Sequence, residues 1–166
     1  YYSDKREQHI LVADGFGNNK EVLSLYKSDG DNVNLIMRKY GYQYSLGLMY
    51  QYATSYCGMK ENQDEYKFLG YEAHIDEILD ETSIDIIDSQ VELTVNNLYN
   101  CYNIGSGLDT TKLMWYDIFE NLVNEIFKYN NYNRVEKTEF NIRVVVAYFI
   151  QQTLEMVLTQ WQQTCT

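Results

Sequence analysis

The sequence predicts an all-α fold: a single-domain helical bundle of five to seven helices with a tyrosine-rich central helix. The 166 residues include no proline, the commonest helix breaker, so long helices are permitted throughout. Large apolar residues recur at spacings of three and four over most of the chain, as on one face of a helix. No Gly/Ser-rich linker divides the sequence, which predicts a single domain over residues 1–166.

The first third of the chain is interpreted as three helices. Residues 4–13 suit a short helix, and residues 18–27 suit a second one with an apolar side. A turn at residues 28–31 separates the second from residues 33–56, which are apolar nearly all round and are interpreted as the buried central helix. Period-two alternation over residues 40–44 leaves a strand as the alternative there.

The rest of the chain is predicted to consist of amphipathic helices that begin at capping residues. Ser83 and Asp109 or Thr110 are suitable caps, and Thr138-Glu139 opens the last helix. The Val144-Val145-Val146 run favours a strand locally, but the patterned segment around it exceeds 20 residues and predicts a long final helix. The predicted helices cover residues 61–81, 84–102, 110–129 and 138–161, with loops at 103–109 and 130–133.

Composition and charge exclude several classes of protein. With a net charge of −11 and its 13 basic residues scattered, the chain is unsuited to binding a nucleic-acid backbone. No run approaches the roughly 18 apolar residues of a membrane span, which predicts that the chain has none. The surplus of residues with AT-rich codons, including 17 tyrosines, favours a virus, phage or other AT-rich accessory genome.

The cysteines indicate an intracellular protein. Cys57, Cys101 and Cys165 are odd in number and lack CxxC spacing, so neither a disulfide framework nor a zinc site is expected. We expect reduced thiols in a host cytoplasm, with a mature secreted protein as the alternative. Only His9 and His74 could supply imidazole ligands, and neither has the carboxylate partners of a helical metal site, so no metal and no cofactor are predicted.

Two sets of residues are candidate interaction sites. The first is a run of carboxylates, interpreted as a docking face for a protein partner, with a basic one the best match in charge, or otherwise as a solvated face. The second is a set of tyrosines, which are enriched at interfaces but also pack in cores. The candidates are Asp76, Glu77, Asp80, Glu81, Asp85 and Asp88, together with Tyr40, Tyr44 and Tyr52.

Two resemblances supply alternative functions. Residues 44–50 with 53–58, and separately residues 141–144, resemble central-helix segments of viral Bcl-2-like proteins, which implies a helical groove binder. Asp117 and Glu120 resemble the first acidic pair of helical nucleotide pyrophosphatases, which implies a small Mg²⁺-dependent helical enzyme. The second pair is missing, because after Glu139 the final helix offers only Glu155.

The sequence therefore predicts a non-enzymatic, acidic, helical interaction or inhibitor protein that acts on a protein partner. A self-assembling capsid or filament subunit is the second hypothesis, because a surface rich in tyrosine and asparagine could pack against copies of itself. The groove binder and the Mg²⁺-dependent enzyme are the remaining alternatives.

Overall fold

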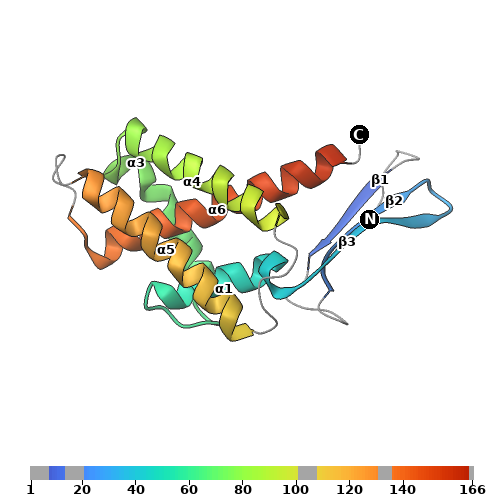
Figure 1. Ribbon diagram of the computed structural model, residues 1–166, viewed down its shortest axis with the longest axis horizontal. Coiled ribbons are helices and arrows are strands. Elements are labelled where there is room, and N and C mark those ends of the chain that lie inside the picture. Colours follow the sequence, from blue (N-terminus) through green and yellow to red (C-terminus); the bar gives the residue numbers. More distant parts are fainter. Residues whose placement is uncertain (1–7, 14–20, 101–107, 131–135, 165–166) are drawn as a thin grey trace.

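The computed structural model describes residues 8–13, 21–100, 108–130 and 136–164. The chain folds as a three-stranded antiparallel sheet followed by a larger helical body, and the sheet lies at one end of that body (Figure 1). The protein is thus mixed α/β, and the prediction of an all-α bundle is wrong. The error lies in the first 40 residues, where strands replace the predicted helices.

The sheet is a meander of β1 (Gln8–Ala13), β2 (Glu21–Ser28) and β3 (Val33–Tyr40), in the order β1-β2-β3. The β2–β3 hairpin closes at the segment predicted as a turn. There Asp29 Oδ1 accepts hydrogen bonds from the backbone N–H groups of Asp31 and Asn32, at 3.1 and 2.7 Å. Gly30 takes a φ of 98°, a left-handed conformation that glycine adopts without steric cost.

An Asp-Gly turn between apolar runs is a strong signal of a β-hairpin. Helices were wrongly predicted on either side of it because this signal was read only as a turn between helices. Two short strands that pair across such a turn satisfy their backbone groups without needing helical periodicity. The second strand ends at Gly41, whose φ of 114° lies outside the helical region. The predicted helix over residues 33–56 is therefore a strand in its first half and a helix only in its second.

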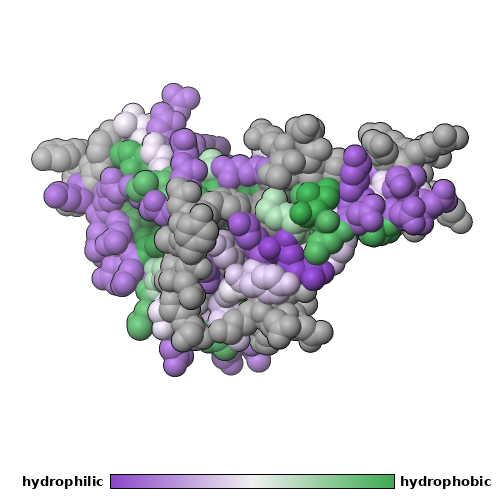
Figure 2. Space-filling view, turned by 45° about the vertical axis from the view of Figure 1, so that its right-hand side comes forward, coloured by the Kyte–Doolittle hydropathy of each residue, from purple (hydrophilic) through white to green (hydrophobic). Residues whose placement is uncertain are grey.

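Strand β3 is at an edge of the described sheet, and its pairing with β2 is irregular. Leu25 lies opposite Met37 but Tyr26 lies opposite Leu35, so Ile36 is an extra residue in the ladder. Large apolar side chains on this strand are exposed, including Val33 at 61% and Leu35 at 47%. Figure 2 shows hydrophobic atoms on the projecting right-hand part of the molecule, beside hydrophilic ones.

After Gly41, a 3-10 turn, η2 (Tyr42–Tyr44), leads into helix α1 (Leu46–Tyr56). Ser45 caps α1, because its Oγ accepts a hydrogen bond from the Leu48 backbone N–H at 3.2 Å. Of the residues 40–44, for which a strand was the alternative to the predicted helix, only Tyr40 is in a strand, and Tyr42–Tyr44 form this 3-10 turn. The helix predicted over residues 61–81 is broken into α2 (Glu65–Leu69), η3 (Gly70–His74) and α3 (Ile75–Ile78).

The three remaining helices confirm the predicted periodicity. They are α4 (Glu81–Asn100), α5 (Leu108–Asn130) and α6 (Glu139–Thr164). Helix α6 begins at Glu139 as predicted, and Thr138 caps it by accepting from the Asn141 backbone N–H at 3.1 Å. Helix α4 is capped by Asp80 rather than by Ser83, whose own N–H donates to Asp80 Oδ1 at 2.9 Å. The predicted loops fall mostly outside the described residues.

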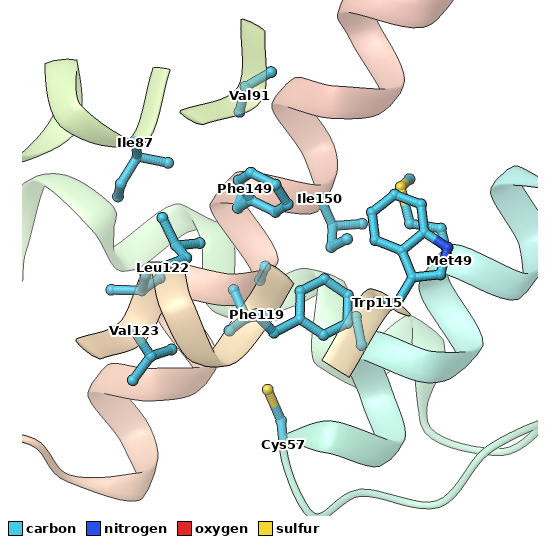
Figure 3. Close-up of a cluster of buried hydrophobic side chains, with 14 of the residues drawn as sticks. Met49, Cys57, Ile87, Val91, Trp115, Phe119, Leu122, Val123, Phe149 and Ile150 are labelled. Carbon is cyan, nitrogen blue, oxygen red and sulfur yellow. The ribbon is translucent and has the colours of Figure 1, made fainter. Parts of the chain in front are cut away.

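Helix α6 is the centre of the helical body, and α1 is not. Every residue from Val144 to Ile150 except Tyr148 is fully buried, with an exposed fraction of 0%. Helix α5 packs Trp115, Phe119 and Leu122 onto this core at helical spacing (Figure 3). A helix buried on nearly all sides has no need of a polar face over that stretch. The prediction of a tyrosine-rich central helix is therefore wrong.

The same burial explains the hydropathy of α6. Its segment Glu139–Gln160 is long and apolar enough, by length and composition, to cross a membrane, and 44% of the 18-residue window is buried inside the protein. A core helix satisfies the same criterion. The fully buried residues in its middle pack against the surrounding helices.

The start of α6 is joined to two other segments by Arg143. Its Nε donates to the Cys57 carbonyl at the end of α1 (3.1 Å), and its Nη1 donates to the Tyr71 hydroxyl in η3 (3.1 Å). Its Nη2 pairs with Glu139, one turn earlier in α6. A planar guanidinium with several donors suits this role, because it bonds three groups at once.

Substitution of Gly41 by alanine should destabilise the protein by more than about 1 kcal/mol. The added Cβ would lie 2.6 Å from Gln43 Oε1, at a φ that alanine rarely adopts. Gly70→Ala is the matched control, since nothing lies within 4 Å of its Cβ position and its backbone is already helical. Urea unfolding measures both, and equal effects of the two changes would contradict this account.

Phe149→Ala should lower the free energy of unfolding by about 3–5 kcal/mol, because it opens a cavity in a fully buried site. Phe140 lies on the same helix but is 43% exposed, so Phe140→Ala should cost much less. Chemical denaturation of both variants checks this. Similar losses at the two positions would show that the middle of α6 is not the core.

Candidate functional site

The acidic residues predicted as a docking face lie along α3 and the first half of α4 and are exposed. Three of them have partners. Asp80 caps α4, and Asp88 Oδ1 accepts a hydrogen bond from the Tyr148 hydroxyl at 2.8 Å. Glu77 pairs with His74 at 2.9 Å on the surface. Of the predicted acidic set, only Asp88 lines a groove, the one between α4 and α6.

The three predicted tyrosines are not brought together in one face. Tyr52 is in the core at 5% exposure, Tyr44 is half-buried, and Tyr40 ends β3 with 49% exposed. The Tyr52 hydroxyl donates to the Leu108 carbonyl at 3.4 Å. Tyr44 lies under the ammonium of Lys39, 5.4 Å from its ring centroid.

A different pair of tyrosines lies among carboxylates along α6. The Tyr50 hydroxyl donates to Gln151 Oε1 at 2.7 Å, and Gln151 Nε2 donates in turn to Glu155 at 3.3 Å. Burial raises the pKa of Tyr50 to about 12, and the nearby Glu72 and Glu155 carboxylates add to the rise. Burial also raises the pKa of Glu72, with Glu155 as the second cause.

Tyr148 belongs to the same polar region. Burial raises the pKa of its hydroxyl well above the usual value, with further contributions from the hydrogen bond to Asp88 and from the charges of Asp76 and Glu72. Both tyrosines therefore remain protonated hydrogen-bond donors at neutral pH. They connect α6 to α1 and to α4 beside the carboxylates of Glu72, Asp88 and Glu155.

Next to this region, α4 and α6 enclose a surface groove of about 440 Å³. The volume falls within the usual range of small-molecule sites. Val91 and Met156 supply its apolar lining, and carboxylates, amides and one hydroxyl supply the rest. The polar lining residues are Asp88, Glu92, Asn96, Gln152, Glu155, Thr159 and Gln160.

The chemistry of the groove follows from these groups. Ionised carboxylates accept hydrogen bonds only, whereas amides both donate and accept. The lining contains three carboxylates and no lysine or arginine. Such a surface suits a ligand that donates hydrogen bonds, such as one with hydroxyl or amine groups, and is unfavourable for a phosphate or another anion.

A second groove of about 330 Å³ lies between α4 and α5, lined by apolar side chains such as Leu93 and Met114 and by the amides of Gln90, Asn97 and Asn121. It contains no titratable group. Within the described ranges, no group of three or more His, Cys, Asp and Glu residues could hold a metal ion. Asp117 and Glu120, the pair that resembled a magnesium site, are exposed on α5.

Cys57 is a free thiol at the end of α1, buried against the core (Figure 3). Burial raises its pKa to about 12, so the nucleophilic thiolate is scarce at neutral pH. Cys101 and Cys165 are outside the described residues.

The comparison with protein families shows which family the chain belongs to. A family model described as the carbamoyltransferase N-terminus matches residues 2–164. The chain belongs to this family. No curated protein matches the chain.

Membership of the carbamoyltransferase N-terminus family corrects the function predicted from the sequence. The family is one of enzymes, so a non-enzymatic viral interaction or inhibitor protein is wrong. The capsid or filament subunit and the Bcl-2-like groove binder are wrong for the same reason. The small Mg²⁺-dependent helical enzyme is wrong in its fold, because the described residues include a sheet.

The sequence reading missed the groove and the polar residues beside it. The available signal was the spacing of Tyr148, Gln151, Gln152, Glu155 and Thr159, which are polar positions three or four residues apart on a helix with a strongly apolar middle. That spacing puts them on one face of α6. Their partners on α1, η3 and α4 could not be found from spacing, because they are distant in the sequence.

Glu155→Gln should lower the pKa of Glu72, because it removes the negative charge that helps to raise it. Native Glu72 binds its proton more tightly than in the unfolded chain. Its contribution to stability is therefore present at low pH, and it is lost as the pH rises from the ordinary pKa of a glutamate through the raised pKa of Glu72 in the folded protein. The substitution should make that decrease smaller. Carbon-detected NMR titration of the Glu72 carboxyl measures the pKa directly. Glu81→Gln, on the exposed start of α4, is the control, and an equal shift in both variants would contradict the assigned contact.

Proposed function

We propose that this chain acts in carbamoyl transfer, as part of an enzyme that moves a carbamoyl group from an activated donor to an acceptor. The observation that supports this is the family match over residues 2–164. We further propose that the groove between α4 and α6 holds the acceptor.

The chemistry of the reaction supports this assignment. An acceptor hydroxyl or amine forms a bond to the carbamoyl carbonyl carbon and loses a proton, while the bond from that carbon to the donor's leaving group breaks and releases phosphate when the donor is carbamoyl phosphate. A carboxylate within hydrogen-bond reach can both orient the nucleophile and accept that proton. The groove offers Asp88, Glu92 and Glu155 for this role. Asp88 already accepts the Tyr148 hydroxyl, which fixes one of its oxygens and leaves the other for a ligand.

The charge of the groove favours the acceptor over the donor. An activated carbamoyl donor such as carbamoyl phosphate is an anion, and proteins bind phosphate with arginine, lysine or helix N-termini. None of the side chains that line the groove is basic. The amides of Asn96 and Gln152 can hydrogen-bond an acceptor's hydroxyl groups, while Val91 and Met156 contact its carbon skeleton.

The test is a transfer assay with labelled carbamoyl phosphate and a panel of amine and hydroxyl acceptors. Glu155→Gln should raise the acceptor KM about 10- to 100-fold, as expected for the loss of a hydrogen bond to a charged group. The donor KM should remain unchanged. Glu81→Gln, which is outside the groove, should leave both constants as in the wild-type protein.

Two results would contradict different parts of the proposal. If the wild-type enzyme transfers no label to any acceptor or to water, carbamoyl transfer itself is not supported. If transfer occurs but Glu155→Gln and Glu81→Gln have the same kinetics as the wild type, the function stands and the groove is not the acceptor site.

A further inference from the structure

The three carboxylates that line the groove between α4 and α6 differ in how the protein holds them. Among the described residues, Glu92 has no hydrogen-bond or ion-pair partner. Glu155 accepts a hydrogen bond from Gln151, one turn earlier on the same helix, at the long distance of 3.3 Å. Asp88 accepts from the Tyr148 hydroxyl at 2.8 Å, and this bond joins α4 to α6 across 60 positions of sequence. Of the three carboxylates, only Asp88 is held by a second helix.

Tyr148 itself has a fixed position. It lies in the buried middle of α6, between Ala147 and Phe149, whose exposed fractions are both 0%. The pKa of its hydroxyl is raised, mainly by burial, so the hydroxyl stays protonated and donates to Asp88 at neutral pH. Tyr148 does not line the groove, so it acts on a ligand there only through Asp88.

The bond to Tyr148 leaves Asp88 suited to one chemical task. An ionised carboxylate only accepts hydrogen bonds, and it has two oxygens for them. Oδ1 receives the Tyr148 hydroxyl, and Oδ2 remains for a ligand in the groove. A general base must lie within about 2.6–3.2 Å of the group whose proton it takes, which favours a carboxylate whose orientation is already fixed. The longer side chains of Glu92 and Glu155 suit binding of the acceptor's other polar groups.

We propose that Asp88 is the base that takes the proton of the acceptor, and that Tyr148 is a positioning residue that holds Asp88 for this step. The inference rests on the proposed function, because it assigns roles within the acceptor site. With carbamoyl phosphate as the donor, the acceptor oxygen or nitrogen forms a bond to the carbamoyl carbon while the bond from that carbon to the phosphate oxygen breaks. The electron pair of the broken bond leaves with phosphate, and the acceptor's proton moves to Asp88 Oδ2. Asp88 then releases this proton to water, which restores the carboxylate.

The experiment compares substitutions in the assay with labelled carbamoyl phosphate and an acceptor that the wild-type protein uses. Asp88→Asn should lower kcat about 100- to 10,000-fold, as expected for the loss of a general base. Tyr148→Phe should lower kcat about 10- to 100-fold, as expected for the loss of a hydrogen bond to a charged group, with little change in the acceptor KM. Tyr116→Phe is the matched control, because it removes the hydroxyl of another half-buried tyrosine, bonded to Ser55 at 2.6 Å and outside the groove. It should leave kcat unchanged.

A double variant separates positioning from a merely structural role. Asp88→Asn keeps an oxygen that accepts the Tyr148 hydroxyl, so the contact between the two helices is retained while the base is lost. In this background Tyr148→Phe should lower kcat no further, because no base is left to hold.

An equal loss of kcat from Tyr148→Phe in both backgrounds would overturn the inference, since the tyrosine would then support the fold alone. Wild-type kcat in Asp88→Asn would overturn it as well, and so would equal losses in Tyr116→Phe and Tyr148→Phe. In each of these cases transfer by the wild-type protein still supports the proposed function. Absence of transfer in the wild-type protein would remove the proposed function, and the inference with it.

Discussion

The burial of the middle of α6 is the constraint on which the helical body depends. Six of the seven residues from Val144 to Ile150 are fully enclosed. Each large apolar side chain gains about 1.5–3 kcal/mol from leaving water, so this segment needs neighbours on every side. Helices α1, α4 and α5 and the turn η3 supply them. Arg143, at the start of the buried stretch, fixes η3 and the end of α1 to the same helix.

The polar residues of α6 take their significance from the same arrangement. Tyr148 is the exception within the buried stretch, and it begins a line of polar side chains that leaves the core on the α4 side. Because the helix is held on its other sides, this line has a fixed position relative to Asp88 and Tyr50. Helix α6 thus lines the groove, together with α4, with a polar face, and the apolar packing of its other faces sets its orientation.

The sequence was sufficient for the elements whose signals are local. Helices α4, α5 and α6 follow from apolar spacing over 20 residues or more, and the Thr138 cap follows from its place before an apolar run. The strands were misread because each is at most 8 residues long, and over that length apolar residues fit either period. The Asp29-Gly30 turn carried the missing information. The candidate site could not be predicted in the same way, since Asp88 and Tyr148 meet across 60 positions of sequence.

The extra residue at Ile36 in β3 also affects how readily the protein pairs with other protein chains. An exposed, apolar edge strand normally offers a regular row of backbone groups with which another chain can pair, and this is a common start of aggregation. At Ile36 the regular repeat is interrupted, so an incoming strand cannot match its hydrogen bonds along the full length of β3. The irregularity therefore makes this exposed strand a poor template for fibril growth.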